Sequence, residues 1–175
     1  FIFKNQFIIY LSGIFLFGCT SKDKVFKRGR VFSKTHVWSQ SNSRIVKYIG
    51  VYKKNKHVKV CLDRAKSRRY LHYIHRVFYN YNLPPELAFL PILESCFDYK
   101  ADSGSARGMW QFTKATAKDF GLEVGFLSDD RLDWRKSTDS AARYLKILGK
   151  RFDNNWELAL AGYNGGPNYL EKQIR

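Results

Sequence analysis

The sequence predicts an all-α fold, and three observations support this class. Apolar residues recur at helical spacing in several segments, no stretch alternates in the manner of a strand for long, and there is no internal repeat. The chain has 175 residues, of which 45% are hydrophobic, enough for one domain with its own core. We therefore expect a single helical domain.

The first part of this domain is expected to contain three helices. Apolar residues at helical spacing predict helices over residues 44–55 and 58–80. Pro84 ends the second helix, because the residue before a proline disfavours helical backbone angles. Pro85 is suited to the first turn of a third helix, which we expect to run to Ser95.

Residues 96–110 break the helical periodicity and are expected to be irregular. Thr113 is predicted to cap a short helix through Asp119, which Gly121 ends. Residues 122–136 are predicted to be a loop or short turns.

Two further helices complete the predicted domain. One begins at Ser137 or Thr138 and runs to about Arg151. The other covers Trp156 to Tyr163 and is ended by the sequence Gly165-Gly166-Pro167.

The N-terminal segment is typical of an export signal. An apolar run over residues 7–18 follows Lys4, and its helical length of about 18 Å is short of the ~30 Å hydrocarbon core of a membrane. We therefore interpret residues 1–18 as a signal peptide rather than a transmembrane helix. Leu16-Phe17-Gly18-Cys19 looks like a lipobox, which predicts acylation of Cys19 and a bacterial lipoprotein anchored to the outer membrane, in the periplasm of the cell envelope. An unlipidated signal peptide and an uncleaved anchor are the alternatives.

The surplus of positive over negative charge lies in the first half of the chain. The formal net charge is +16, and residues 83–175 hold 13 basic and 13 acidic side chains. A surplus of this size suggests a polyanionic partner such as nucleic acid, anionic lipid or cell-wall polymer. The signal-like N-terminus argues against nucleic acid, so residues 19–43 are interpreted as a basic tether at the envelope.

Glu94 is the first candidate for chemistry. It follows the apolar residues Leu87, Leu90 and Leu93, and apolar surroundings raise the pKa of a carboxyl group, as a general acid requires. Taken alone, however, a glutamate at a helix end is more often solvated or engaged in capping.

Two downstream motifs strengthen that candidate. Gly108-Met109-Trp110-Gln111-Phe112 joins a carboxamide and large apolar groups to a flexible glycine. Ala161-Gly162-Tyr163-Asn164-Gly165-Gly166-Pro167 places a phenol and an amide at a helix end. Amides, phenols and aromatic faces are groups that bind sugars.

In this order the motifs resemble the lytic transglycosylase family with the soluble lytic transglycosylase-like, lysozyme-like helical domain related to goose-type lysozyme. The similar stretches are LPPELAFLPILESCFDYKADSGSARGMWQFTKATAKDFGL and WELALAGYNGGP, within residues 44–175. The resemblance implies cleavage of the MurNAc-β-1,4-GlcNAc bond of peptidoglycan with formation of 1,6-anhydro-MurNAc ends, by a monomer that needs no metal or cofactor. The family continues beyond the second motif into more helix, whereas this sequence ends eight residues after Pro167.

The resemblance also implies roles for individual residues. Glu94 is expected to be the catalytic acid and base, with Ser95 supporting the hydrogen bonds of its helix end and Met109 packing on a sugar face. The full set expected to bind substrate is Ser95, Ser103, Gly108, Met109, Gln111, Tyr163 and Asn164.

Two other functions on the same fold stay open. A hydrolytic muramidase would need a second carboxylate to activate water, for which Asp98 and Asp102 are the nearby candidates. A wall-binding protein without activity is the other.

The remaining reactive side chains have structural interpretations. Cys96 is expected to be buried and free, with pairing to Cys61 as the alternative, and no C-x-x-C pair is present. The four histidines, His36, His57, His72 and His75, are interpreted as surface or packing residues without metal-ligand spacing to a carboxylate or cysteine.

Overall fold

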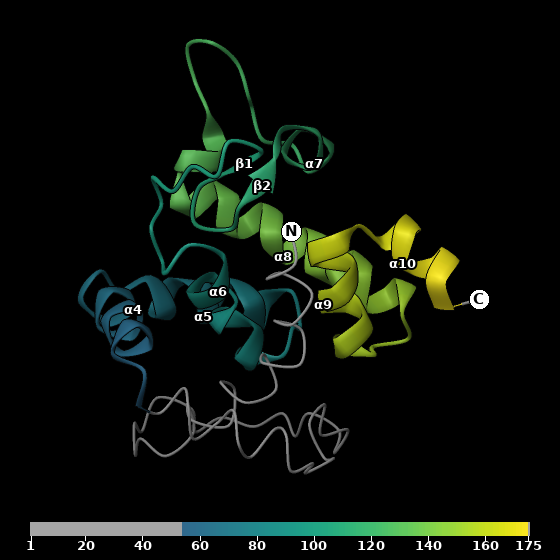
Figure 1. The fold of residues 1–175 in the computed structure, drawn as a ribbon, viewed down its shortest axis with the longest axis horizontal. Coiled ribbons are helices and arrows are strands. Elements are labelled where there is room, and N and C mark those ends of the chain that lie inside the picture. Colours follow the sequence, from purple (N-terminus) through teal and green to yellow (C-terminus); the bar gives the residue numbers. More distant parts are fainter. Residues whose placement is uncertain (1–53, 175) are drawn as a thin grey trace.

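The computed structural model describes residues 54–174 and is mainly helical, which confirms the all-α prediction (Figure 1). Its elements are α4 (Lys56–Ser67), α5 (Tyr70–Asn80), the 3-10 helix η3 (Pro85–Phe89), α6 (Pro91–Glu94), β1 (Ala106–Arg107), β2 (Phe112–Thr113), α7 (Lys114–Asp119), the 3-10 helix η4 (Asp130–Leu132), α8 (Trp134–Arg151), α9 (Trp156–Gly165) and α10 (Pro167–Ile174). The two short strands form an antiparallel pair: β1 lies within the segment expected to be irregular, and β2 follows that segment directly before α7.

Several predictions concern residues that the structure does not describe. The signal peptide over 1–18, the lipidation of Cys19, the tether over 19–43 and all but the last two residues of the helix expected over 44–55 lie outside the described residues. Within residues 54–174, none of the helices combines the length and the apolar character needed to cross a membrane.

The longest helix, α8, organises the domain. It packs against α5 on one side and against α9 towards its C-terminal end. Figure 1 shows the β1–β2 hairpin and α7 on one side of α8, with α4, α5 and α6 on the other. The core between these elements is built from large, fully buried side chains, including Trp110, Phe78, Phe97, Leu145 and Leu148.

The single helix expected over 58–80 is wrong, because the chain forms two helices there. α4 ends at Ser67, and Arg69 has a left-handed backbone with φ of 55°. The turn places Tyr70 in the core, where its ring lies 4.9 Å from that of Trp134. The apolar spacing continues across this turn, so periodicity alone does not reveal the break.

The helix expected over 85–95 also differs. It consists of the 3-10 helix η3 followed by the four-residue helix α6. Pro91 has no backbone N–H and disrupts a continuous α-helix at this point. The amides of Leu90 and Leu93 instead bond the carbonyls three residues earlier, at 3.1 and 3.0 Å.

The later helices follow the predictions more closely. Thr113 caps α7 by accepting a hydrogen bond from the amide of Thr116, as expected. α8 begins at Trp134, earlier than predicted, because Asp133 accepts from the amides of Arg135 and Lys136. α9 continues to Gly165, and α10 follows it directly.

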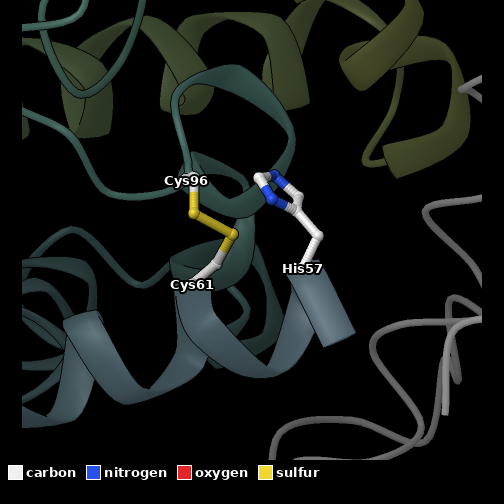
Figure 2. A group of neighbouring side chains, drawn as sticks. All are labelled: His57, Cys61 and Cys96. Carbon is white, nitrogen blue, oxygen red and sulfur yellow. A yellow bond between two sulfur atoms is a disulfide. The ribbon is translucent and has the colours of Figure 1, made fainter. Parts of the chain in front are cut away.

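Cys61 and Cys96 form a disulfide, so the expectation that Cys96 is free is wrong. The bridge joins α4 to the residue that lies two positions after Glu94, with a Cα–Cα distance of 4.7 Å (Figure 2). The two cysteines are 35 residues apart in sequence. The packing of α4 beside α6 decides in favour of the alternative, in which Cys96 pairs with Cys61.

Candidate active site

Glu94 is the last residue of α6 and is half-buried. Its amide donates to the carbonyl of Leu90 at 3.3 Å, and the amide of Ser95 donates to Pro91 at 3.0 Å. The chain then leaves the helix, because Ser95 has a φ of −150°. Glu94 therefore sits at the point where a very short helix gives way to a turn.

Ser95 connects this helix end to the Gly108–Gln111 segment. Its hydroxyl donates to the carbonyl of Met109 at 2.8 Å and accepts from the amide of Asp98 at 3.2 Å. This geometry ties the end of α6 to the Gly108–Gln111 segment. It also shows that the hydroxyl is already engaged on both sides by the protein.

Residues 108–111 form a tight turn that only glycine permits at its first position. The amide of Gln111 donates to the carbonyl of Gly108 at 3.1 Å, and the two residues have φ of +48° and +81°. A Cβ at Gly108 would lie 1.8 Å from the carbonyl oxygen of Arg131. The glycine in this motif is thus required by a close backbone approach.

The two residues inside the turn point into the core. The Met109 and Trp110 side chains are fully buried, and the Trp110 indole donates to the Thr138 hydroxyl at 2.9 Å. In this structure Met109 cannot pack on a sugar face as expected, because none of its side chain reaches the surface. Its contribution to the site is its carbonyl, which holds Ser95.

Tyr163 approaches the same turn from α9. Its hydroxyl donates to the carbonyl of Trp110 at 2.8 Å, and its ring lies 5.1 Å from that of Tyr144. Burial raises the pKa of the Tyr163 phenol well above its usual value of 10.0, and the charge of Glu94 raises it further. The phenol is therefore a neutral hydrogen-bond donor, and it lies close enough to Glu94 for the carboxylate charge to affect its pKa.

The three motifs thus meet at two consecutive carbonyl groups. Ser95, beside Glu94, holds Met109, and Tyr163 holds Trp110. A half-buried carboxyl group, a neutral phenol and a tight turn come together from segments that are far apart in the sequence.

The other expected substrate ligands lie around this centre. Gln111 is half-buried, and its side-chain amide donates to the carbonyls of Gly108 at 2.9 Å and Ala101 at 3.4 Å. Ser103 is exposed and exchanges hydrogen bonds with the backbone of Ala106. Asn164 is half-buried next to Tyr163.

Residues 73–175 match the family described as Transglycosylase SLT domain. The chain belongs to this family. The match begins within α5 and includes Glu94, the Gly108–Gln111 turn and Tyr163, whereas α4 precedes it.

Curated relatives of this SLT domain carry related names. The chain is 37% identical over 111 residues to Membrane-bound lytic murein transglycosylase D of Escherichia coli K12, which covers 63% of this chain and 25% of that protein. It is 41% identical over 114 residues to a protein of Alteromonas sp. strain M-1 named for tributyltin chloride resistance, covering 65% of this chain and 55% of that protein. It is 44% identical over 64 residues to Peptidoglycan transglycosylase gp16 of phage T7, covering 36% and 5%. The chain therefore spans between one twentieth and about half of the length of these relatives.

A network of charges supports the SLT domain on the other side of the turn, and the sequence patterns did not reveal it. Asp129 binds the buried Arg131 at 2.7 Å and Arg107 at 3.4 Å, and Arg107 binds Asp102 at 2.7 Å. Arg131 also donates to the carbonyl of Phe112, just beyond the turn, at 3.4 Å. The pKa of Asp102 is lowered by the hydrogen bond from the amide of Gly104 and by Arg107. The pKa of Asp129 is lowered chiefly by its hydrogen bond from Arg131.

His57 is an exposed residue of α4, as expected of a surface histidine, but it lies closer to two cysteines than the sequence interpretation allowed. Its ring lies beside the Cys61–Cys96 bridge, and the potential ligand atoms of these three residues lie within 4.8 Å of one another (Figure 2). The four-residue spacing of His57 and Cys61 on one helix face was the available signal. Cys96 joins them only through the tertiary fold.

Proposed function

We propose that this SLT domain is a lytic transglycosylase that cleaves the MurNAc-β-1,4-GlcNAc bond of peptidoglycan and leaves 1,6-anhydro-MurNAc ends, in cell-wall turnover or remodelling. The observation that carries the proposal is the convergence of Glu94, Tyr163 and the Gly108–Gln111 turn in a chain of this family. The names of the relatives from Escherichia coli and phage T7 agree with transglycosylase activity on peptidoglycan.

Glu94 carries both proton transfers in the proposed reaction. Its carboxyl group gives a proton to the oxygen that links the two sugars, and the C1–O bond breaks. The N-acetyl oxygen of the substrate stabilises the positive charge that develops at C1. The Glu94 carboxylate then takes the proton of the C6 hydroxyl as O6 bonds to C1, so that no water enters the product.

Tyr163 and the Gly108–Gln111 turn are proposed to surround Glu94 while it acts first as an acid and then as a base. A neutral phenol near Glu94 leaves the carboxylate without a competing negative charge, because the pKa of Tyr163 is raised. Gln111, Asn164 and Ser103 are proposed to contact the sugars at the edges of the site, and Gly108 to allow the close approach of the chain.

The engagement of the two nearby aspartates supports a transglycosylase over a hydrolase. Asp102 is ion-paired to Arg107 and accepts from the amide of Gly104, at 2.7 and 2.8 Å. Asp98 accepts from the amide of Lys100 at 2.9 Å. A water-activating base works best with a pKa near the working pH, whereas the pKa of Asp102 is lowered.

Product analysis of digested glycan strands tests the proposal. Mass spectrometry should find 1,6-anhydro-MurNAc ends with the parent chain, and Glu94→Gln should lower their rate of formation by about a thousandfold, within the range of a general acid–base. The variant should keep its far-UV circular dichroism spectrum. Ordinary reducing ends would assign the chain to the hydrolases, and tight glycan binding without turnover would indicate a wall-binding protein.

We further propose that the protein acts as a monomer in the periplasm, anchored to the outer membrane through a lipidated Cys19 and the basic segment that follows. The Leu16-Phe17-Gly18-Cys19 motif supports this placement. Expression in a bacterial host with labelled fatty acid should label the parent protein and not Cys19→Ser. Sedimentation of the described domain should give the mass of one chain.

A further inference from the structure

The Cys61–Cys96 disulfide connects α4 to the turn that follows Glu94. Cys61 is fully buried on α4, and Cys96 lies two residues after Glu94. α4 precedes the residues that match the SLT family. A segment outside the matched region is therefore covalently joined to the candidate catalytic turn.

The backbone of this turn is held in an uncommon conformation. Cys96 and Phe97 both have φ of 56°, in the left-handed region that side chains rarely adopt. Two such residues in succession persist only where the surroundings hold them in place. The turn after Glu94 therefore depends on its contacts.

Three contacts to this turn come from α4, and one of them is an ion pair between Arg64 and Asp98 at 3.8 Å. The disulfide holds the Cys96 side chain, and the Arg64 guanidinium donates to the Cys96 carbonyl at 3.2 Å. From within the turn, Phe97 is fully buried, and its amide donates to Pro91 at 3.1 Å. α4 thus holds Cys96 by both its side chain and its carbonyl.

The position of Glu94 depends on the same turn. α6 has only four residues, so its own hydrogen bonds give Glu94 little support. Ser95, between Glu94 and Cys96, makes the link to Met109. A shift of Cys96 would move Ser95 and loosen the link between Glu94 and the Gly108–Gln111 turn.

We infer that the Cys61–Cys96 disulfide and Arg64 are positioning elements for Glu94, so that full turnover requires the oxidised bridge. The inference rests on the proposed function, since it assigns to α4 an effect on the rate of that reaction. It names Cys61, Cys96 and Arg64 as residues that act through the turn and do not touch the substrate.

A zinc site is the competing use of the same residues. Within the described part of the chain, His57, Cys61 and Cys96 are the one group of three side chains placed to hold a metal ion. Zinc binds cysteine as the thiolate, and two sulfurs bonded to each other do not supply thiolates. The two uses exclude each other and can be told apart by experiment.

The first experiment compares the oxidised chain with the chain treated with dithiothreitol, and with the double variant Cys61→Ser/Cys96→Ser. Reduction breaks the Sγ–Sγ bond, and the two sulfurs gain two electrons and two protons as the reagent closes to a cyclic disulfide. We expect kcat on soluble glycan strands to fall about tenfold to a hundredfold, as for a slightly displaced catalytic group. KM should change far less, and the pH profile of kcat should shift.

Two further variants separate positioning from stability. Arg64→Gln keeps the bridge and should lower kcat by a smaller factor. Val77→Ala, at a buried position of α5, should lower the melting temperature while kcat at 25 °C stays at the parent value. Unchanged kcat in the reduced chain and the double serine variant would overturn the inference, as would a purified chain with two free thiols and one bound zinc ion.

Hydrogen exchange on the same samples needs no enzymatic activity. The amides of Ser95, Phe97 and Asp98 are hydrogen-bonded in the turn and should lose protection on reduction. Unchanged protection would overturn the positioning role even in an active enzyme. A lack of anhydro products from the oxidised parent chain would instead count against the proposed function.

Discussion

The Gly108–Gln111 turn is held from two sides by different kinds of interaction. On the neutral side, the hydroxyls of Ser95, Tyr163 and Thr138 bind groups of Met109 and Trp110. On the ionic side, Asp102, Arg107, Asp129 and Arg131 form a chain of ion pairs that reaches the carbonyl of Phe112. The candidate catalytic group, Glu94, lies with the neutral side.

This difference has a physical consequence for the site. Hydrogen bonds between neutral groups depend little on salt and persist while the pH changes, so the hydroxyls of the neutral side can keep their contacts when Glu94 changes its protonation. Ion pairs respond to both salt and pH. The two ion pairs of the ionic side differ in burial: the side chains of Arg131 and Asp129 are largely buried, whereas those of Arg107 and Asp102 are more than 40% exposed.

The largest effect is expected where the two sides meet, at Gly108. Gly108→Ala forces a Cβ against the Arg131 carbonyl at 1.8 Å and strains a φ of +81°. We expect the free energy of unfolding to fall by about 4 kcal/mol, at the upper end for single substitutions. Urea denaturation followed by circular dichroism would measure the loss.

Gly104→Ala is the matched control for this variant. Gly104 has a similar φ of +82°, but a Cβ there meets nothing within 4 Å. Its cost should be about 1 kcal/mol, from backbone strain alone. Equal losses at the two positions would contradict the close approach to Arg131.

The next largest effect is expected on the ionic side, at Asp129. Asp129→Asn leaves the Arg131 guanidinium, whose side chain is 8% exposed, without its carboxylate. Removing one partner of a buried pair costs about 3 kcal/mol. Because the pKa of Asp129 is lowered from 3.8 in the folded state, its contribution is present above pH 3.8 and declines as the pH falls below it.

Urea denaturation between pH 3 and 7 would test both the size and the pH dependence. Asp102→Asn is the control, since its carboxylate is 41% exposed and pairs with an exposed Arg107; its effect should be smaller than that of Asp129→Asn and should shrink in high salt. If Asp102→Asn destabilises the chain as much as Asp129→Asn, the contribution of an ion pair to stability does not depend on its burial here.

On the neutral side, Tyr163→Phe should have a smaller effect on stability and a clear effect on turnover. It leaves the Trp110 carbonyl without its donor at 2.8 Å, which costs about 1–2 kcal/mol, and the ring contacts remain. Because the turn near Glu94 loosens, we expect kcat to fall about tenfold or more. Tyr169→Phe, at a residue that is 65% exposed on α10, should change neither quantity.

The smallest effect concerns His75, a titrating group in α5 whose ring lies 6.0 Å from that of Phe89 in η3. Burial lowers the pKa of His75 from its usual 6.5, with a contribution from His72. A lowered pKa means that the folded state prefers the neutral ring. Stability should therefore be full above pH 6.5 and decline as the pH falls below it.

Free energies of unfolding measured between pH 5 and 7.5 would show this slope in the parent chain. His75→Gln should reduce it, whereas His72→Gln, at an exposed position, should keep most of it. A slope that survives His75→Gln would assign the pH response to another group.

Much of the helical framework could be predicted from local sequence, because local contacts produce it. Thr113 and the glycine that follows α7 act within a few residues of the chain. The helical spacing of α8 and α9 was equally visible, although Asp133 starts α8 earlier than expected. The site could be assembled from three motifs only because they resembled a known family in type and order.

The sequence by itself determined the helical class, several helix ends such as those of α7 and the C-terminal end of α8, and the motif that carries Glu94. The tertiary structure decided that Cys61 pairs with Cys96, that Met109 is buried, that the chain turns at Arg69, and that Arg131 and Asp129 brace the turn. The physical reason is the range of the interactions. Caps and helical spacing are set within a few residues, whereas a disulfide across 35 residues or an ion pair beneath a turn exists only once distant elements have packed together.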